Sequence, residues 1–134
     1  MRWVFGMSVV LALACGGTPA PPTEIDASLI VGGQAFEPDV CHNGNGFAFV
    51  GIHLEDSKTG VKLRLLPGDG ESTNGFVITR SKATGYELTD CGAMTHSPDG
   101  TEVDGIPNVS GTAQVSCGKG IFAVEGSVTY AHCH

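Results

Sequence analysis

Two histidines near the end of the sequence have the spacing of metal ligands. The last segment reads VTYAHCH, residues 128–134, and Cys133 separates His132 from His134. Residues two apart on a β-strand lie on the same face, so both imidazoles would point toward one ion. Imidazole suits zinc, copper and nickel, although a site needs at least one more ligand. The other interpretation is an exposed strand end, which we favour because terminal residues fray, and we assign no cofactor. The other histidines of the chain, which could supply the further ligand, are His42, His53 and His96.

Two short segments resemble parts of trypsin-like proteases. Residues 30–33 read IVGG, like the new N-terminus of an activated protease, and residues 128–133 read VTYAHC, like the segment with the catalytic histidine. In that family the two segments lie much closer together, and the nucleophilic serine follows the histidine. A catalytic triad needs a nucleophile, a base and an orienting carboxylate that meet in space. The similarity therefore assigns no catalytic residue, and we expect the protein not to be an enzyme.

An acidic segment is a third candidate site. Asp99, Glu102 and Asp104 lie in DGTEVDG, residues 99–105, and their oxygens suit calcium. Their spacing differs from that of the calcium-binding EF-hand loop. We favour a solvated hairpin loop here.

Five cysteines bear on where the protein is located. Cys15 follows an apolar segment, which leaves Cys41, Cys91, Cys117 and Cys133, an even number typical of disulfides in a small exported domain. Three pairings are possible. A regular hairpin over residues 111–131 would hold Cys117 and Cys133 too far apart for a disulfide, so 117–133 would need a bend. We favour 41–133 with 91–117. Four zinc-bound thiolates are the alternative, but the sequence has no Cys-x-x-Cys pair.

The first residues have the pattern of a secretory signal. Arg2 precedes an apolar run from Trp3 to Ala14, which is too short to span a bilayer and ends in small residues. Followed by Cys15, the run resembles the lipobox of bacterial lipoprotein precursors, although Ala12 and Leu13 depart from the preferred residues. The resemblance implies a signal peptide over residues 1–14 and a lipid on Cys15. An ordinary signal cleaved near residue 20 is the alternative.

A Pro- and Gly-rich segment follows the cysteine. Residues 16–27 read GGTPAPPTEIDA, too poor in apolar groups to fold, and we expect residues 15–27 to be the lipidated cysteine and a semi-rigid tether. Gly16 in place of Asp implies, by the same resemblance, the outer membrane. Without Arg2, six basic side chains face 14 acidic ones, a net charge of −8. Such a domain repels phosphate backbones, so nucleic acid is excluded as a partner.

The rest of the chain, residues 28–134, has the period-2 pattern of β-strands punctuated by Gly, Pro, Asn and Asp. The sequence predicts an all-β domain, an antiparallel β-sandwich or small barrel of about seven strands. A long polar loop is expected over residues 95–108. The expected strands cover residues 28–36, 46–56, 61–66, 76–80, 86–94, 109–117 and 121–133.

The folded part also resembles the small β-rich lipoprotein antigens of mycobacteria. The similarity lies in LIVGGQAF at residues 29–36, in GTAQV and VEGSVT within the last hairpin, and in the closing cysteine. It implies a surface-exposed, non-enzymatic lipoprotein. The expected function is a membrane-anchored cell-envelope lipoprotein that acts as a non-catalytic binding or surface module, with an unknown protein or cell-surface partner. The alternative is a periplasmic metal-binding protein that uses His132 and His134.

Overall fold

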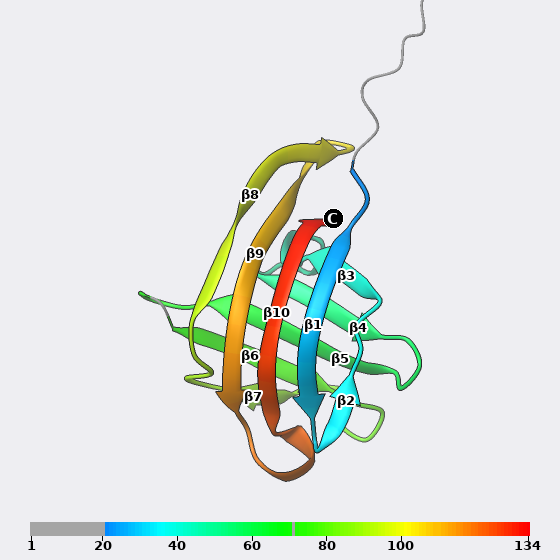
Figure 1. The fold of residues 1–134 in the computed structure, drawn as a ribbon, viewed down its shortest axis with the longest axis vertical. Coiled ribbons are helices and arrows are strands. Elements are labelled where there is room, and N and C mark those ends of the chain that lie inside the picture. The colour runs from blue at the N-terminus through cyan, green and yellow to red at the C-terminus, as the bar shows by residue number, and fades with distance from the viewer. Residues whose placement is uncertain (1–20, 71) are drawn as a thin grey trace, which may run out of the picture.

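The protein is an all-β sandwich of two antiparallel five-stranded sheets. The computed structural model describes residues 21–70 and 72–134. Sheet A has the order β2-β1-β10-β9-β8, and sheet B has the order β3-β4-β5-β6-β7. The sheets lie face to face, and the strands of sheet B cross behind those of sheet A at a steep angle (Figure 1). The strands are β1 (Glu24–Val31), β2 (Gln34–Phe36), β3 (Val40–Asn43), β4 (Ile52–Asp56), β5 (Val61–Pro67), β6 (Thr73–Ile78), β7 (Tyr86–Leu88), β8 (Met94–Val103), β9 (Ile106–Cys117) and β10 (Val124–Cys133); two short 3-10 turns are η1 (Gly44–Phe47) and η2 (Gly120–Phe122).

The core forms between the inner faces of the two sheets because apolar residues alternate along the strands. In β5, Leu63 and Leu65 are fully buried, while Arg64 between them points to the other face. These positions follow the half-buried pattern read from the sequence. Within residues 21–70 and 72–134, neither helical turn has the length or apolar character needed to cross a bilayer. Besides the two leucines, the buried apolar residues are Leu29, Val31, Phe36, Cys41, Ile52, Leu54, Val77, Leu88, Cys91, Met94, Val109, Ala113, Val115, Val124, Val128, Tyr130 and Cys133.

Both disulfides form in the favoured pairing. Cys41 bonds to Cys133, with their Cα atoms 5.3 Å apart, and this bond joins β3 of sheet B to β10 of sheet A. Cys91 bonds to Cys117, with a Cα separation of 4.8 Å. Cys91 lies where the chain passes from β7 of sheet B to β8 of sheet A, so this second bond stabilises that crossover.

Two of the predicted strands are wrong. One contains a two-residue turn, and the other spans the passage from one sheet to the other. Residues 28–36 are not one strand but the β1–β2 hairpin, since Gly32 and Gly33 both have positive φ and reverse the chain. Of residues 86–94, only 86–88 form β7, Met94 begins β8 in the other sheet, and residues 89–93 connect the two. The first strand also begins earlier than expected: β1 starts at Glu24, so the last four residues assigned to the tether pair with β10.

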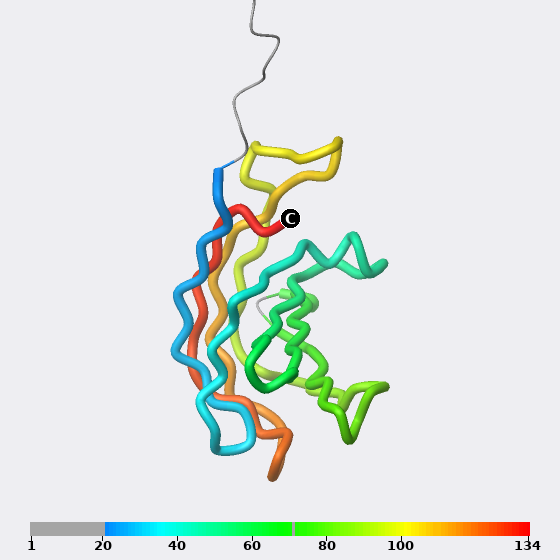
Figure 2. Tube along the Cα trace, turned by 90° about the vertical axis from the view of Figure 1, so that its right-hand side faces the viewer, coloured from blue at the N-terminus to red at the C-terminus, as the bar shows by residue number. Residues whose placement is uncertain are grey.

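Residues 95–108 are a long hairpin rather than a polar loop. Strand β8 continues to Val103, and β9 begins at Ile106. Asp104 and Gly105 make the turn between them, with φ values of 51° and 78°. Asp-Gly favours this turn, in which both central residues have positive φ. The hairpin projects beyond the rest of the sandwich (Figure 2). The last hairpin, β9–β10, is confirmed, with η2 in the connection before β10.

A β-bulge near the end of β10 changes which side chains face the core. Tyr130 pairs with Gly111 and Cys133 pairs with Val109, so two residues of β10 oppose one residue of β9. His132 has a φ of 56° at this point. Cys133 therefore faces the core with Val128 and Tyr130, whereas an uninterrupted strand would place it on the opposite face.

Candidate functional site

A loop without charged residues closes over the outer face of sheet B. Residues 44–51 read GNGFAFVG, and we call them the 44–51 loop. The Asn43 side chain starts the loop by accepting a hydrogen bond from the Asn45 backbone N–H at 3.1 Å, and its own amide donates to the Pro107 carbonyl at 2.8 Å. The Gly44 backbone N–H donates to the Gly51 carbonyl at 2.8 Å and closes the loop. One asparagine thus fixes both the loop and its position against β9.

Two glycines let the loop fit against its neighbours. A Cβ atom on Gly44 would lie 2.6 Å from the Phe49 ring, and one on Gly51 would lie 2.1 Å from the Leu65 carbonyl oxygen. Gly51 also has a φ of 143°, which L side chains rarely adopt.

Residues 46–56 were predicted to be one strand, and this is wrong for the first half. The loop was missed because its aromatic residues read as strand residues.

Beneath the loop, three basic side chains form a row across neighbouring strands. His42 on β3 pairs in register with His53 on β4, which pairs with Arg64 on β5. The Phe47 ring stacks on His53 with centroids 4.4 Å apart, and the Arg64 guanidinium lies 4.9 Å from the Phe47 centroid. The same guanidinium is 5.3 Å from Phe49. This cover leaves His53 only 1% exposed although it lies outside the main core.

The hydrogen bonds of His53 define its protonation. Arg64 Nε can only donate, so the His53 Nδ1 atom, 3.0 Å away, must accept. The proton is then on Nε2, which donates to the Glu55 carboxylate at 2.9 Å. Burial, together with the positive charge of Arg64, lowers the pKa of His53, against the opposing effect of Glu55. His53 is therefore neutral, because a proton on Nδ1 would face the Arg64 donor.

A cleft of about 220 Å³ separates the 44–51 loop from the β8–β9 hairpin. Phe47 forms one wall and Ile106 the other, and each is about two-fifths exposed, at 42% and 40%. The His134 Nδ1 atom in this wall is buried and has no hydrogen-bond partner. Such a cleft suits an apolar group that carries one hydrogen-bonding atom. The other lining residues are His42, Asn43 and Gly46.

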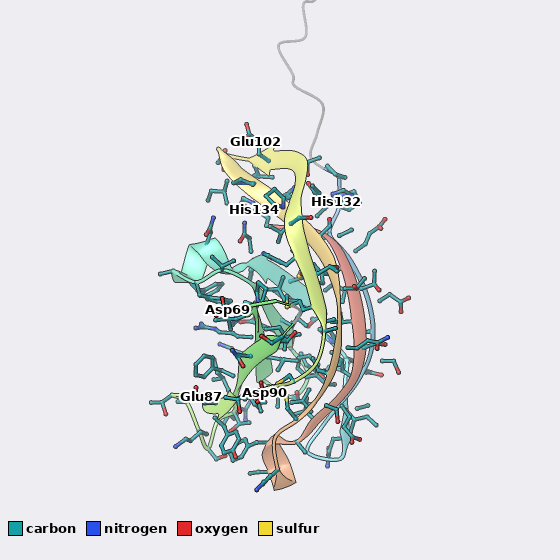
Figure 3. All side chains as sticks on the ribbon, turned by 90° about the vertical axis from the view of Figure 1, so that its left-hand side faces the viewer. Asp69, Glu87, Asp90, Glu102, His132 and His134 are labelled. Atoms are coloured by element: carbon teal, nitrogen blue, oxygen red, sulfur yellow. A yellow bond between two sulfur atoms is a disulfide. The ribbon has the colours of Figure 1, made fainter. Side chains whose placement is uncertain are left out.

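The two histidines predicted as metal ligands have different partners. His132 Nδ1 lies 2.7 Å from Asp99 Oδ2, whereas the backbone carbonyl of His134 accepts a hydrogen bond from His42 Nδ1 at 2.8 Å. Figure 3 shows the two imidazoles on either side of the β8 ribbon, with Glu102 farther out along the hairpin. The prediction assumed that residues two apart in the last strand lie on the same face, and the bulge in β10 interrupts this alternation between His132 and His134. In residues 21–70 and 72–134, no three His, Cys, Asp or Glu side chains are grouped to hold a metal ion.

Asp99, the first residue of the acidic segment, belongs to a polar cluster between β8, β9 and β10. Its carboxylate accepts hydrogen bonds from Thr101 and Ser110 in addition to the contact with His132. Burial raises the pKa of Asp99, but these hydrogen bonds outweigh it and hold the pKa well below its usual range. The Asn108 amide extends the cluster by donating to Thr101. Protein groups thus occupy one of the three carboxylates that were considered for calcium.

The polar cluster does not have the geometry of a catalytic triad. The Ser110 hydroxyl donates to Asp99 at 2.9 Å and accepts the His132 backbone N–H at 3.2 Å. A nucleophilic serine would instead donate to the imidazole. Ser110 satisfies the backbone group that the bulge frees, so the cluster stabilises the strand ends.

The chain was compared with protein-family models, with curated proteins and with solved structures, and none of them matches it.

Proposed function

We propose that this protein is a lipid-anchored lipoprotein of the bacterial cell envelope, in which residues 28–134 act as a non-catalytic binding or surface module. The observation that carries the proposal is the use of the cysteines. The chain has five, and the described domain uses four in its two disulfides. Cys15 is the fifth, and it follows the apolar segment that resembles a lipoprotein signal. Disulfides at the other four positions support an oxidising compartment.

The described polar groups support a binding role over a catalytic one. His53 has Arg64 on one nitrogen and Glu55 on the other, so it has no free nitrogen to accept a substrate proton. Asp99 and Ser110 are hydrogen-bonded to each other. The cleft beside Phe47 has aromatic and aliphatic walls that suit a ligand or a partner side chain.

Replacement of Cys15 tests the anchor. We expect the wild-type precursor to be processed in a globomycin-sensitive step and the mature chain to sediment with membranes. Cys15→Ser should stay unprocessed by this route, and its precursor should incorporate no labelled palmitate. The matched control is Ser28→Ala, an exposed change in β1 that leaves the signal intact. Identical processing, labelling and fractionation of Cys15→Ser and wild type would exclude the proposal.

A further inference from the structure

We propose that the 44–51 loop, together with Ile106 of the β8–β9 hairpin, forms a second membrane contact that docks on the surface of a neutral phospholipid bilayer. The inference rests on the proposed lipid anchor at Cys15. It adds an orientation: the cleft end of the sandwich faces the membrane, and η2 faces away from it.

Exposed apolar side chains gather at the loop and the hairpin. Val50 is 65% exposed, and Phe47 and Ile106 line the same cleft from opposite sides. Single exposed apolar residues are ordinary on protein surfaces, but a group of them on an uncharged loop marks an interaction site. The other large apolar side chains exposed in the described chain are Ile30 in β1 and Ile121 in η2.

Hydrogen bonds place this loop at the end of the domain where the tether enters. The Thr23 hydroxyl donates to the His132 carbonyl at 2.9 Å, one residue before β1 begins. The same end of β10 reaches β3 through His42 and the His134 carbonyl. The amide of Asn43 then reaches Pro107 of β9. Figure 2 shows the β8–β9 hairpin at the end of the sandwich where β1 begins, with the loop that follows β3 projecting sideways below it.

The length of chain before Thr23 brings this end within reach of the membrane. Cys15 lies eight positions earlier, and eight residues span at most about 28 Å when fully extended. A domain held this closely meets the bilayer at a high effective concentration. An apolar patch too small to bind membranes alone can then add a second contact.

The charges around the patch favour a neutral lipid surface. The hairpin carries Glu102 and Asp104 on either side of Val103, and anionic headgroups would repel them. Arg64, a cation near the loop, packs under it against Phe47 and Phe49 and does not form a basic patch for anionic lipid. We therefore expect docking on phosphatidylcholine and weaker docking on phosphatidylglycerol.

A tryptophan reporter tests the contact. The only tryptophan of the chain is Trp3, which the proposed processing removes. Val50→Trp places a reporter in the loop, and Ile121→Trp is its matched control, because Val50 and Ile121 are both 65% exposed. Each lipidated chain is reconstituted into phosphatidylcholine vesicles with brominated acyl chains. We expect a blue shift and bromine quenching for Val50→Trp and neither for Ile121→Trp.

Each other result overturns the proposal. Equal quenching of the two variants means unspecific adsorption. No quenching of Val50→Trp in an anchored chain means that the loop faces water or a protein partner, while the anchor itself stands. If the chain does not associate through a lipid, the anchor fails, and the second contact fails with it because it needs the tether. Phe47→Trp serves as a second reporter if Val50→Trp does not fold.

Discussion

Removing the Cys41–Cys133 disulfide should destabilise the protein more than removing Cys91–Cys117. The two bonds have sequence separations of 92 and 26 residues. A disulfide limits the unfolded chain, and its effect grows with the logarithm of the loop that it closes. That relation gives about 4.6 kcal/mol for the longer loop and about 3.5 kcal/mol for the shorter one. The expected difference is therefore about 1 kcal/mol.

The measurement uses two double variants, Cys41→Ala with Cys133→Ala and Cys91→Ala with Cys117→Ala. Urea unfolding followed by far-ultraviolet circular dichroism gives the free energy of unfolding of each. Wild type measured with and without a reductant shows the combined loss. Cys117 is less buried than the other three cysteines, so packing losses should widen the difference in the same direction. An equal or larger loss in the 91–117 variant would refute the argument from loop length.

Four further changes have defined outcomes. The pKa of Asp99 is lowered on folding, so its contribution to stability is present above about pH 4 and is lost as the pH falls. Asp99→Asn should therefore lower the free energy of unfolding in urea by about 2 kcal/mol at pH 7. A variant whose stability falls with acid as steeply as that of wild type would contradict this. Phe47→Ala should raise the pKa of His53 toward its ordinary value, because water would reach the imidazole. An unchanged NMR titration of His53 would show that the Phe47 ring does not shield it from water. Gly105→Val should lose about 1–2 kcal/mol in thermal unfolding, since a β-branched residue is strained at a φ of 78°, and unchanged stability would show that the turn is dispensable. His132→Ala should leave zinc uptake in calorimetry unchanged, and a lower uptake than wild type would restore the metal hypothesis.

The fold class could be predicted from the sequence because alternation is a local property. Leu63, Arg64 and Leu65 alternate in type and in exposure, and several such segments were enough to predict a sandwich. The strand ends were harder. Gly32–Gly33 and Asp104–Gly105 are turn signals in themselves, yet the first lay inside an apolar run and the second inside a polar one. The apolar run was therefore read as one strand, and the polar one as a loop.

The candidate site could not be predicted because its parts meet only in the folded chain. His42, His53 and Arg64 come from three strands, and their alignment depends on the register of sheet B. The 44–51 loop carried one usable signal, an uncharged run between glycines, but its aromatic residues also suit a strand. The length of the last hairpin argued against only one of the three disulfide pairings, and the preference for 41–133 with 91–117 over the remaining one is confirmed by the structure.

The bulge in β10 makes the strand tolerant of a deletion. Ala131 and His132 together oppose one residue of β9, so the strand contains one residue more than a regular ladder requires. A chain lacking His132 would still alternate from Val128 through Tyr130 to the cysteine, which would keep its inward direction. The deletion should therefore preserve the bond to Cys41 and remove only the imidazole beside Asp99. Mass spectrometry of the oxidised deletion variant would show whether this extra residue serves the polar cluster and not the framework of the sandwich.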